Sequence, residues 1–518
     1  MNDNEKATIQ QNPFQIVPPN QRWVPNPSQK ELDFGDFSKL MPPLVAKIRV
    51  AVHDWRTNDY KGVSDTTKAL LTFWFKQPHP DNFQFFFSQR EAIETIAYLF
   101  EVKRAYEKYD LMRFDGSGGR LSTGMFDEDW TRYVIKMATG AGKTKVMALT
   151  LVWAYFHKLY ETDSRLSRNF LIIAPNIIVL ERLKKDLEEL KMLFQEPFVP
   201  VDGFQDRDWH TDFQFTYHYQ DELKTLAQHG NVFLTNTHRV GFNDDTTPTD
   251  EGSYWMGTKP KPDADTSKGL DLGKILRGDK IKDLVILNDE AHHVHDPSLA
   301  WFKNIKEIHE RLLAENGFGL SLQTDFTATP KNSSGGIFPQ TVSDYPLVEA
   351  IKQGVVKTPV LPDDESRKLL VEKPSDDFIE RYKDFLDLGY TEWEKQFEAL
   401  SPHKTPILFV MSADTKDANE VAKYLDTLPK LKDKVLTIHT KSNGEIIEGT
   451  SKKDKDALKI MRKAANDIDS DSSPYRAVVS VLMLREGWDV RNVTTSVGLR
   501  ILTWGKSSKS KKTKPRAK

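Results

Sequence analysis

The segment MATGAGKT, residues 137–144, has the residue types and the order of a phosphate-binding loop. It follows an apolar, β-like run and precedes the apolar helix candidate KVMALTLVWAYF. Glycines let backbone amides approach a polyphosphate at a helix N-terminus, Lys143 reaches the β and γ oxygens, and Thr144 offers a hydroxyl to Mg²⁺. We therefore predict an ATP and Mg²⁺ site here, rather than a chance glycine-rich turn. The nucleotide-contacting positions are Thr139, Gly140, Ala141, Gly142, Lys143 and Thr144.

A second segment, VILNDEAHH at residues 285–293, delivers two acids at the polar end of an apolar run. Ligand sites form at such ends in α/β proteins. Asp289 is predicted to hold Mg²⁺ and Glu290 to orient and deprotonate the attacking water, because phosphoryl transfer needs mainly positioning and charge neutralisation. A solvated strand end is the alternative for an isolated acidic pair. Combined with the loop upstream, the pair predicts ATP hydrolysis with Glu290, Asp289 and Lys143 as catalytic residues.

Four neighbouring residues, His292, His293, His295 and Asp296, suggest a transition-metal cluster. They lack the H-x-x-x-H spacing that presents two histidines on one helix face, so we expect no protein-bound transition metal. The chain contains no cysteine, which excludes disulfides and cysteine-bound zinc.

Short runs of β-branched and apolar residues alternate with helix-prone segments from about residue 80 onward. Nearly all are apolar throughout, as expected for strands covered on both faces. The alternation predicts the α/β class, with parallel sheets flanked by helices. The strand candidates lie at residues 132–139, 169–175, 230–236, 283–290, 322–330, 405–412, 434–440 and 475–483.

Three segments, MATGAGKT, DEAH and TAT, together resemble motifs I, II and III of superfamily 2 helicases of the DEAD/DEAH-box type. SQREAIETI (88–96) resembles the adenine-recognising Q motif, and IIAPNIIVLERL (172–183) resembles motif Ia. Further along, ILFVMSADTKDANEVAKYL resembles motif IV and SVLMLREGWDVRNV resembles motif V. The spellings of motifs I and V, with DYPLVEAIKQGVVKTPVL (344–361), are similar to the Res, or R, subunit of type III restriction enzymes.

The resemblance implies two RecA-like lobes, with nucleotide in the cleft between them and a DNA strand across both. Gln89 would recognise adenine, and Gly487 and Asp489 would lie at the nucleotide cleft. Thr327 and Thr329 would couple hydrolysis to lobe movement through their hydroxyls. Individually, each matched strand-facing position is explained equally well as a capping or structural residue. These positions are Pro175, Asn176, Asn236, Thr237, Ser412, His439 and Thr440.

A chain of 518 residues is too long for one compact core, so several domains are expected. The first 35 or so residues are rich in Asn, Gln and Pro, which predicts an extended arm. The predicted parts are an N-terminal arm and family-specific region at 1–75, a first lobe at 76–345 with a polar insertion at about 242–273, a connector at 346–403, a second lobe at 404–505 and a basic tail at 506–518.

After VGLR (497–500) the family pattern continues to motif VI, whose arginines act on the γ-phosphate, whereas this chain reads ILTWGKSSKSKKTKPRAK. Neither motif VI nor a nuclease pattern is recognisable there, so we expect an incomplete second lobe. An arginine finger contributes several orders of magnitude in rate, so feeble turnover is expected. The hypotheses are a truncated or frameshifted Res-type subunit and a naturally short protein with a nucleic-acid-binding tail.

The leading prediction is an ATP-dependent DNA translocase or helicase motor, acting on double-stranded DNA in restriction and phage defence. An ATP-gated DNA-binding remnant and an RNA helicase are the alternatives. The resemblance also implies a modification (methyltransferase) subunit as partner. A net charge of −2 neither supports nor excludes nucleic-acid binding. The sequence has no signal pattern and no stretch long enough to cross a bilayer, so a cytoplasmic protein without membrane contact is expected.

Overall fold

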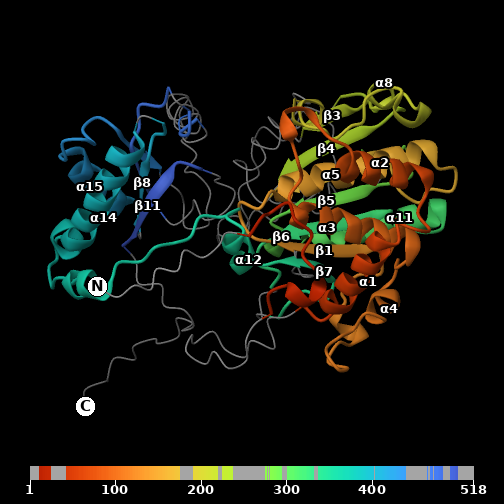
Figure 1. Ribbon diagram of the computed structural model, residues 1–518, viewed down its shortest axis with the longest axis horizontal. Coiled ribbons are helices and arrows are strands. Elements are labelled where there is room, and N and C mark those ends of the chain that lie inside the picture. The colour runs from red at the N-terminus through yellow and green to blue at the C-terminus, as the bar shows by residue number, and fades with distance from the viewer. Residues whose placement is uncertain are drawn as a thin grey trace, which may run out of the picture. The chain divides into compact units, whose positions relative to one another are not determined.

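Two compact units divide the chain, Met1–Pro359 and Val360–Lys518. Figure 1 shows the helices and strands of both units. The computed structural model describes residues 11–24, 42–174, 191–219, 224–236, 275–276, 278, 280–293, 300–331, 336–401, 403–412, 414–438, 464, 467–470, 472–481 and 490–499. The predicted insertion at 242–273 and the predicted tail at 506–518 lie outside these ranges.

The first unit contains a seven-stranded sheet in the order β3-β4-β2-β5-β6-β1-β7. All its strand pairs are parallel, so the carboxyl ends of the strands share one edge. The strands are β1 (Arg132–Met137), β2 (Asn169–Ala174), β3 (Thr216–Tyr219), β4 (Asn231–Asn236), β5 (Val285–Asp289), β6 (Leu322–Thr327) and β7 (Thr341–Tyr345).

Helices cover both faces of this sheet, which explains why strands such as β2 and β5 are largely apolar. Along β2, Phe170 and Ile172 join one buried cluster, whereas Leu171 and Ile173 join another on the opposite face. The first cluster includes residues of α1 (Val45–Thr57), α2 (Asp65–Lys76), α3 (Phe87–Ala97) and α5 (Lys143–Tyr160), and the second includes residues of α11 (Ala300–Asn316).

Short helices fill the connections of the first unit. The short α-helices are α4 (Lys108–Met112), α7 (Lys191–Gln195), α8 (Trp209–Asp212) and α12 (Leu347–Lys352). The 3₁₀ helices are η1 (Pro19–Gln21), η3 (Pro80–Asn82), η5 (Thr123–Met125), η6 (Phe204–Asp206) and η7 (Ala291–His293), and η4 (Tyr98–Val102) is a π-helix.

The N-terminal region belongs to the first unit rather than standing apart from it. Residues 11–24 have little regular structure, as their composition predicts, but they are fixed in place. The N–H of Phe87 in α3 donates to the carbonyl of Pro13 at 2.8 Å, and the Arg22 side chain is buried. Helix α1 packs against β7 and α3.

The second unit contains a four-stranded parallel sheet in the order β11-β8-β10-β9. Its strands are β8 (Ile407–Ser412), β9 (Val435–Ile438), β10 (Ala477–Val481) and β11 (Val493–Gly498), and its helices are α13 (Asp364–Leu369), α14 (Phe378–Leu400) and α15 (Thr415–Asp426). With the first unit, this sheet confirms the predicted α/β class of two RecA-like lobes built on parallel sheets flanked by helices.

Helix α14 falls inside the segment predicted as a connector, but it is part of the core of the second unit. Leu386, Gly389 and Trp393 are buried and lie on one face of the helix. The Nε1 of Trp393 donates to the carbonyl of Pro406 at 3.1 Å, just before β8. Charged residues on the other faces of α14 explain its connector-like composition.

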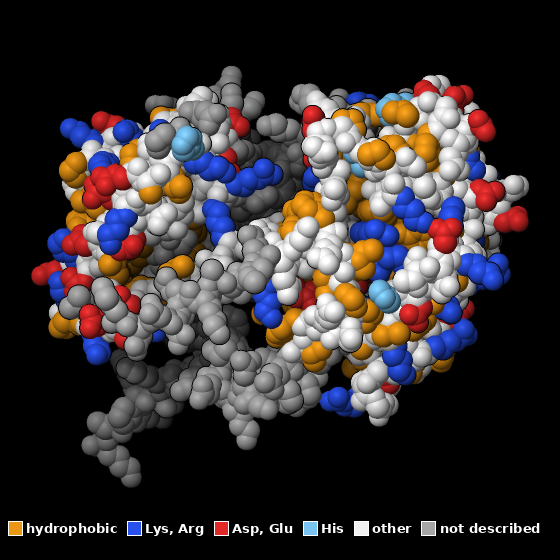
Figure 2. Space-filling model, viewed as in Figure 1, with side chains coloured by type: hydrophobic (Ala, Val, Ile, Leu, Met, Phe, Trp, Pro, Cys, Tyr) orange, Lys and Arg blue, Asp and Glu red, His pale blue; other side chains and the backbone are white. Residues whose placement is uncertain are grey.

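Neither unit shows a surface dominated by one sign of charge on the face drawn in Figure 2. On the face visible in Figure 2, acidic and basic side chains are interspersed on each unit. Within the described part of the chain, no helix has the length and apolar character needed to cross a bilayer.

The packing of α14 on β11 predicts an unusual response at Gly389. Ala is favoured over Gly inside a helix by about 1 kcal/mol. A Cβ at position 389, however, would overlap Cγ2 of Val497, and overpacking costs about 1–3 kcal/mol. We expect Gly389→Ala to destabilise the second unit by about 1 kcal/mol, measured as faster hydrogen exchange of the α14 amides.

The matched control is the same substitution in a Val497→Ala background, where the overlapping methyl is gone. There Gly389→Ala should stabilise α14, because only the helix propensity remains. The same sign of effect in both backgrounds would contradict the packing explanation.

Candidate nucleotide site

The predicted phosphate-binding loop occupies residues 138–142, between the end of β1 and the start of α5. Gly140 and Gly142 have φ angles of 80° and 86°, a region that side chains disfavour. Gly142 is the N-cap of the 18-residue α5. The N-terminal N–H groups of this long helix, which have no partner within the helix, therefore face this loop. Thr139 and Gly140 are exposed, and Thr144 is partly exposed. This arrangement suits a bound polyphosphate.

Lys143 contacts Glu290, so the two segments singled out in the sequence meet in space. The Nζ of Lys143 donates to Oε1 of Glu290, across 147 residues of sequence. Lys143 is 9% exposed and Glu290 is 7% exposed, which makes this a nearly buried ion pair. A phosphate that binds Lys143 must therefore compete with the Glu290 carboxylate.

The two adjacent acids at the end of β5 are separated by a sharp backbone turn. Asp289 is the last residue of the strand, and Glu290 follows it with a φ of 49°. Left-handed backbone costs a non-glycine residue about 1–2 kcal/mol. The Glu290 N–H donates to Oδ1 of Asp289 at 3.1 Å, which stabilises the turn. Both acids are buried, so neither is a solvated strand end.

His292 connects this turn to the predicted coupling residues. Its Nδ1 lies 3.0 Å from Oγ1 of Thr327 and 3.6 Å from Oε2 of Glu290. Oγ1 of Thr327 in turn accepts a hydrogen bond from the N–H of Thr329 at 3.1 Å. Three consecutive contacts thus connect Glu290 to Thr329 in the loop after β6.

The residues considered for a transition-metal cluster fall only partly within the described chain. His295 and Asp296 lie outside the described residues. Among the described residues, no three His, Cys, Asp or Glu side chains are grouped so that they could hold a metal ion. Asp289 and Thr144 supply oxygen atoms, the ligands that Mg²⁺ prefers.

Gln89, predicted to recognise adenine, contacts the phosphate loop itself. It is 2% exposed, and its Nε2 donates to the carbonyl of Ala141 at 3.2 Å. Its Oε1 accepts from the N–H of Phe86 at 3.0 Å. A Cβ at position 142 would overlap Nε2 of Gln89, so Gly142 is needed for this close approach as well as for its φ angle.

Buried ion pairs hold α3, the helix that carries Gln89. Glu91 pairs with Arg22 of the N-terminal segment and, at 3.4 Å, with Arg49 of α1. Arg22 also pairs with Glu349 at 2.8 Å. Burial alone would raise the pKa of Glu91, but the charges of Arg22 and Arg49 lower it to about 2. Sequence reasoning missed Arg22, because a single Arg in a Pro-rich segment gives no local signal.

A second buried polar network lies beneath the acidic pair. Nε and Nη2 of Arg132 in β1 donate to Oδ2 of Asp325 in β6 at 2.8 and 2.6 Å. Asn288, directly before Asp289, donates from Nδ2 to Oδ1 of the same carboxylate at 2.5 Å. Asp325 is fully buried. This network fixes the end of β5 relative to β1 and β6.

The network extends away from the site to Glu128. Burial raises the pKa of this carboxyl group. Nη1 of Arg132 donates to it at 3.2 Å, and Nε2 of Gln340 donates to its two oxygens at 2.7 and 2.9 Å. Each buried charge is therefore held by several donors, as burial of a charge requires.

The structure describes few of the predicted strand-facing positions. Asn236 ends β4. Ser412 ends β8 but is only 1% exposed, so contact with a ligand would require it to be uncovered. The other predicted positions lie outside the described residues: Pro175, Asn176, Thr237, His439, Thr440, Gly487 and Asp489.

Comparison with known proteins finds a family that resembles the part of the chain carrying the site. Residues 82–332 match the model of the family described as type III restriction enzyme, res subunit. This segment of the chain is therefore similar to that family. It carries Gln89, the predicted phosphate loop, the acidic pair and both predicted coupling threonines.

Comparisons over the whole chain give weaker likenesses. The crystal structure of T4 UvsW shares 13% identity over 82% of this chain and 63% of its own, with a TM-score of 0.24. The yeast DEAD-box splicing factor Prp28 shares 13% identity over 72% of this chain and 67% of its own, with a TM-score of 0.21. The chain thus spans less than two thirds of the T4 UvsW chain. No curated protein sequence matches it.

The buried ion pair between Arg132 and Asp325 predicts a large loss of stability when one partner is removed. Arg132→Leu leaves the Asp325 charge buried without its main donor, which costs about 3–5 kcal/mol. We expect a corresponding drop in the free energy of unfolding of the first unit, measured by urea denaturation. The double variant Arg132→Leu with Asp325→Leu should recover part of the loss. A double variant that is less stable than the single one would contradict this account.

The Arg22–Glu91 pair predicts a dependence of stability on pH. The folded pKa of about 2 lies below the ordinary value of 4.5, so the pair stabilises the fold above pH 4.5 and its contribution is lost as pH falls towards 2. Glu91→Gln should lower stability at neutral pH by about 3 kcal/mol and flatten the pH dependence in this range. The exposed Glu310→Gln serves as the control and should leave the profile unchanged.

Proposed function

We propose that the chain is a nucleic-acid-dependent ATPase, the motor of a DNA translocase or helicase. The contact between Lys143 and Glu290 is the observation that carries this proposal. A phosphate-binding lysine and a carboxylate at the end of a neighbouring strand are the two groups that ATP hydrolysis requires at one place. Their burial supplies the low-dielectric surroundings in which charge stabilisation is effective.

In the proposed mechanism, ATP binds with its phosphates at the N-terminus of α5. Lys143 leaves Glu290 and binds the β and γ oxygens. Thr144 and Asp289 would hold Mg²⁺, which would supply neutralisation of phosphate charge. Glu290, released from Lys143, orients a water molecule and accepts its proton. The water oxygen attacks the γ-phosphorus and the bond to the β-γ bridging oxygen breaks, giving ADP and phosphate.

The pairing of Lys143 with Glu290 gives this mechanism a built-in order. While the pair is closed, the carboxylate is engaged and a poor base. Binding of the triphosphate separates the pair, so the base becomes available only when substrate is present. The contact of His292 with both Glu290 and Thr327 then offers a route by which hydrolysis reaches the second coupling residue, Thr329.

DNA is the proposed polymer, supported by the match of residues 82–332 to a restriction-enzyme family. The same match supports a role in restriction and a modification (methyltransferase) subunit as partner. RNA is the competing polymer, because motor motifs of this kind serve both. Competition between double-stranded DNA and RNA for stimulation of ATPase activity discriminates between them.

The central test is the steady-state ATPase activity of the purified chain with and without double-stranded DNA. A general base contributes about 10²–10⁴-fold in rate, so Glu290→Gln should reduce the DNA-stimulated turnover rate by about that factor. The same variant should retain or improve ATP binding, because Lys143 loses a competing partner. Glu310→Gln, the same change at an exposed position, should behave as the unsubstituted protein.

Two results would contradict the proposal. One is the absence of ATP binding, and the other is turnover that Glu290→Gln does not change. ATP binding without turnover, with DNA affinity that depends on nucleotide, would instead favour the ATP-gated DNA-binding alternative.

A further inference from the structure

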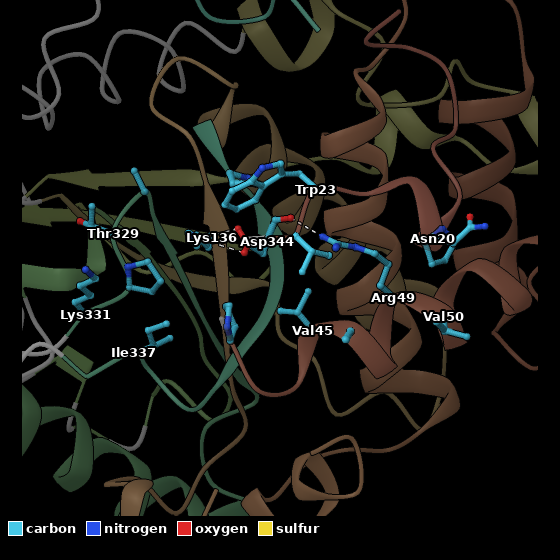
Figure 3. A pocket seen from close by; sticks show the side chains of 17 residues that line it. Asn20, Trp23, Val45, Arg49, Val50, Lys136, Thr329, Lys331, Ile337 and Asp344 are labelled. Atoms are coloured by element: carbon cyan, nitrogen blue, oxygen red, sulfur yellow. Dashed lines mark hydrogen bonds and ion pairs between the residues drawn. The ribbon is translucent and has the colours of Figure 1, made fainter. Parts of the chain in front are cut away.

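A cavity of about 520 Å³ lies in the first unit. It lies beside the loop after β6, which carries Thr329 and is called the coupling loop below, and not at the phosphate loop. Its wall is formed by the N-terminal segment, α1, the ends of β1 and β7, and the loop after β6 (Figure 3). Of the described residues that line it, none belongs to 138–144. The proposed ATPase mechanism makes no use of this space.

The wall of the cavity is mostly apolar and is held firmly. Trp23, Val45, Pro330 and Ile337 contribute large apolar surfaces. The segment that carries Trp23 is fixed in place. The backbone N–H of Trp23 donates to Oε1 of Glu349 at 2.7 Å, and the preceding residue, Arg22, is buried. A preformed apolar cavity of this size is in the range that encloses small organic ligands.

The polar groups of the cavity give it an excess of positive charge. Arg49, Lys136 and Lys331 line it, against one acid, Asp344. Lys136 pairs with Asp344 at 3.0 Å, and Nη2 of Arg49 donates to the carbonyl of Asp344 at 2.6 Å (Figure 3). Lys136 pairs with Asp344 and Arg49 pairs with Glu91 at 3.4 Å, so Lys331 is the lining cation that favours an anion on an otherwise apolar ligand.

We propose that this cavity is a binding site for a small aromatic ligand that carries one anionic group. The aromatic body lies among the apolar side chains with Trp23, and the anionic group lies towards Lys331, the basic residue of the coupling loop. The site is separate from the nucleotide site. It contacts the strand that leads into the phosphate loop through Lys136, and the coupling loop through Thr329.

The test uses two fluorescent probes with the same aromatic body, anilinonaphthalene sulfonate and the uncharged N-phenylnaphthylamine, titrated into the full chain. The unsubstituted protein should bind both saturably. Ala46 is an exposed residue of α1 that lines the cavity, so Ala46→Trp fills the space without disturbing the core. It should weaken both probes at least about tenfold. Lys47→Trp, on the same helix but outside the lining, should change neither.

The charge is tested separately. Lys331→Glu should weaken the sulfonate about threefold or more and leave the uncharged probe unchanged. Lys303→Glu, an equal charge change on exposed surface outside the cavity, should affect neither probe. Absence of saturable binding, or affinity that Ala46→Trp does not alter, would overturn the site. Equal weakening of both probes by Lys331→Glu would overturn the preference for an anion.

Discussion

Strand β6 pairs in parallel with β1 on one side and β5 on the other. The register of these two pairings determines how far the carboxyl end of each strand extends along the sheet. Lys136 lies opposite Thr327, and Asp289 lies opposite Phe326. The predicted phosphate loop, the acidic pair and the predicted coupling threonines therefore begin within about one residue of the same sheet edge. A slip of one position in either pairing would turn side chains to the opposite face and separate Lys143 from Glu290.

The strands could be predicted well from sequence where burial on both faces dictates composition. All eight predicted runs form strands, but β3, β7 and β11 were not predicted. Each of these is at a sheet edge, where fewer neighbours demand apolar side chains, and the sequences TYHY and TVSDY accordingly look polar. The edge strand β9 was predicted, because its sequence VLTI is mostly apolar. A polar edge strand is recognised only by its pairing partner, which no local pattern records.

The candidate site likewise contains residues that could be predicted from sequence and residues that could not. Lys143 and Glu290 lie in segments whose residue order carries the chemistry, so their meeting could be anticipated. Asp325 gave a signal that went unused, since an acid inside a strand predicted to be covered on both faces requires a buried cation or several hydrogen-bond donors. Arg22 gave none. Its partners lie 69 and 327 positions away, and only the folded chain brings them together.

The contact of Arg22 with Glu349 also constrains when the first unit can finish folding. Strand β7, which completes the sheet beside β1, ends at Tyr345, and Glu349 lies in the next helix, α12. On the ribosome, Arg22 and Glu91 emerge long before Glu349, so the N-terminal segment must wait for nearly the entire unit to be synthesised. Contacts of such large sequence separation form slowly. Until then the wall of the cavity carrying Trp23 lacks its anchor, and the unit has an exposed apolar face that aggregation or chaperones can reach.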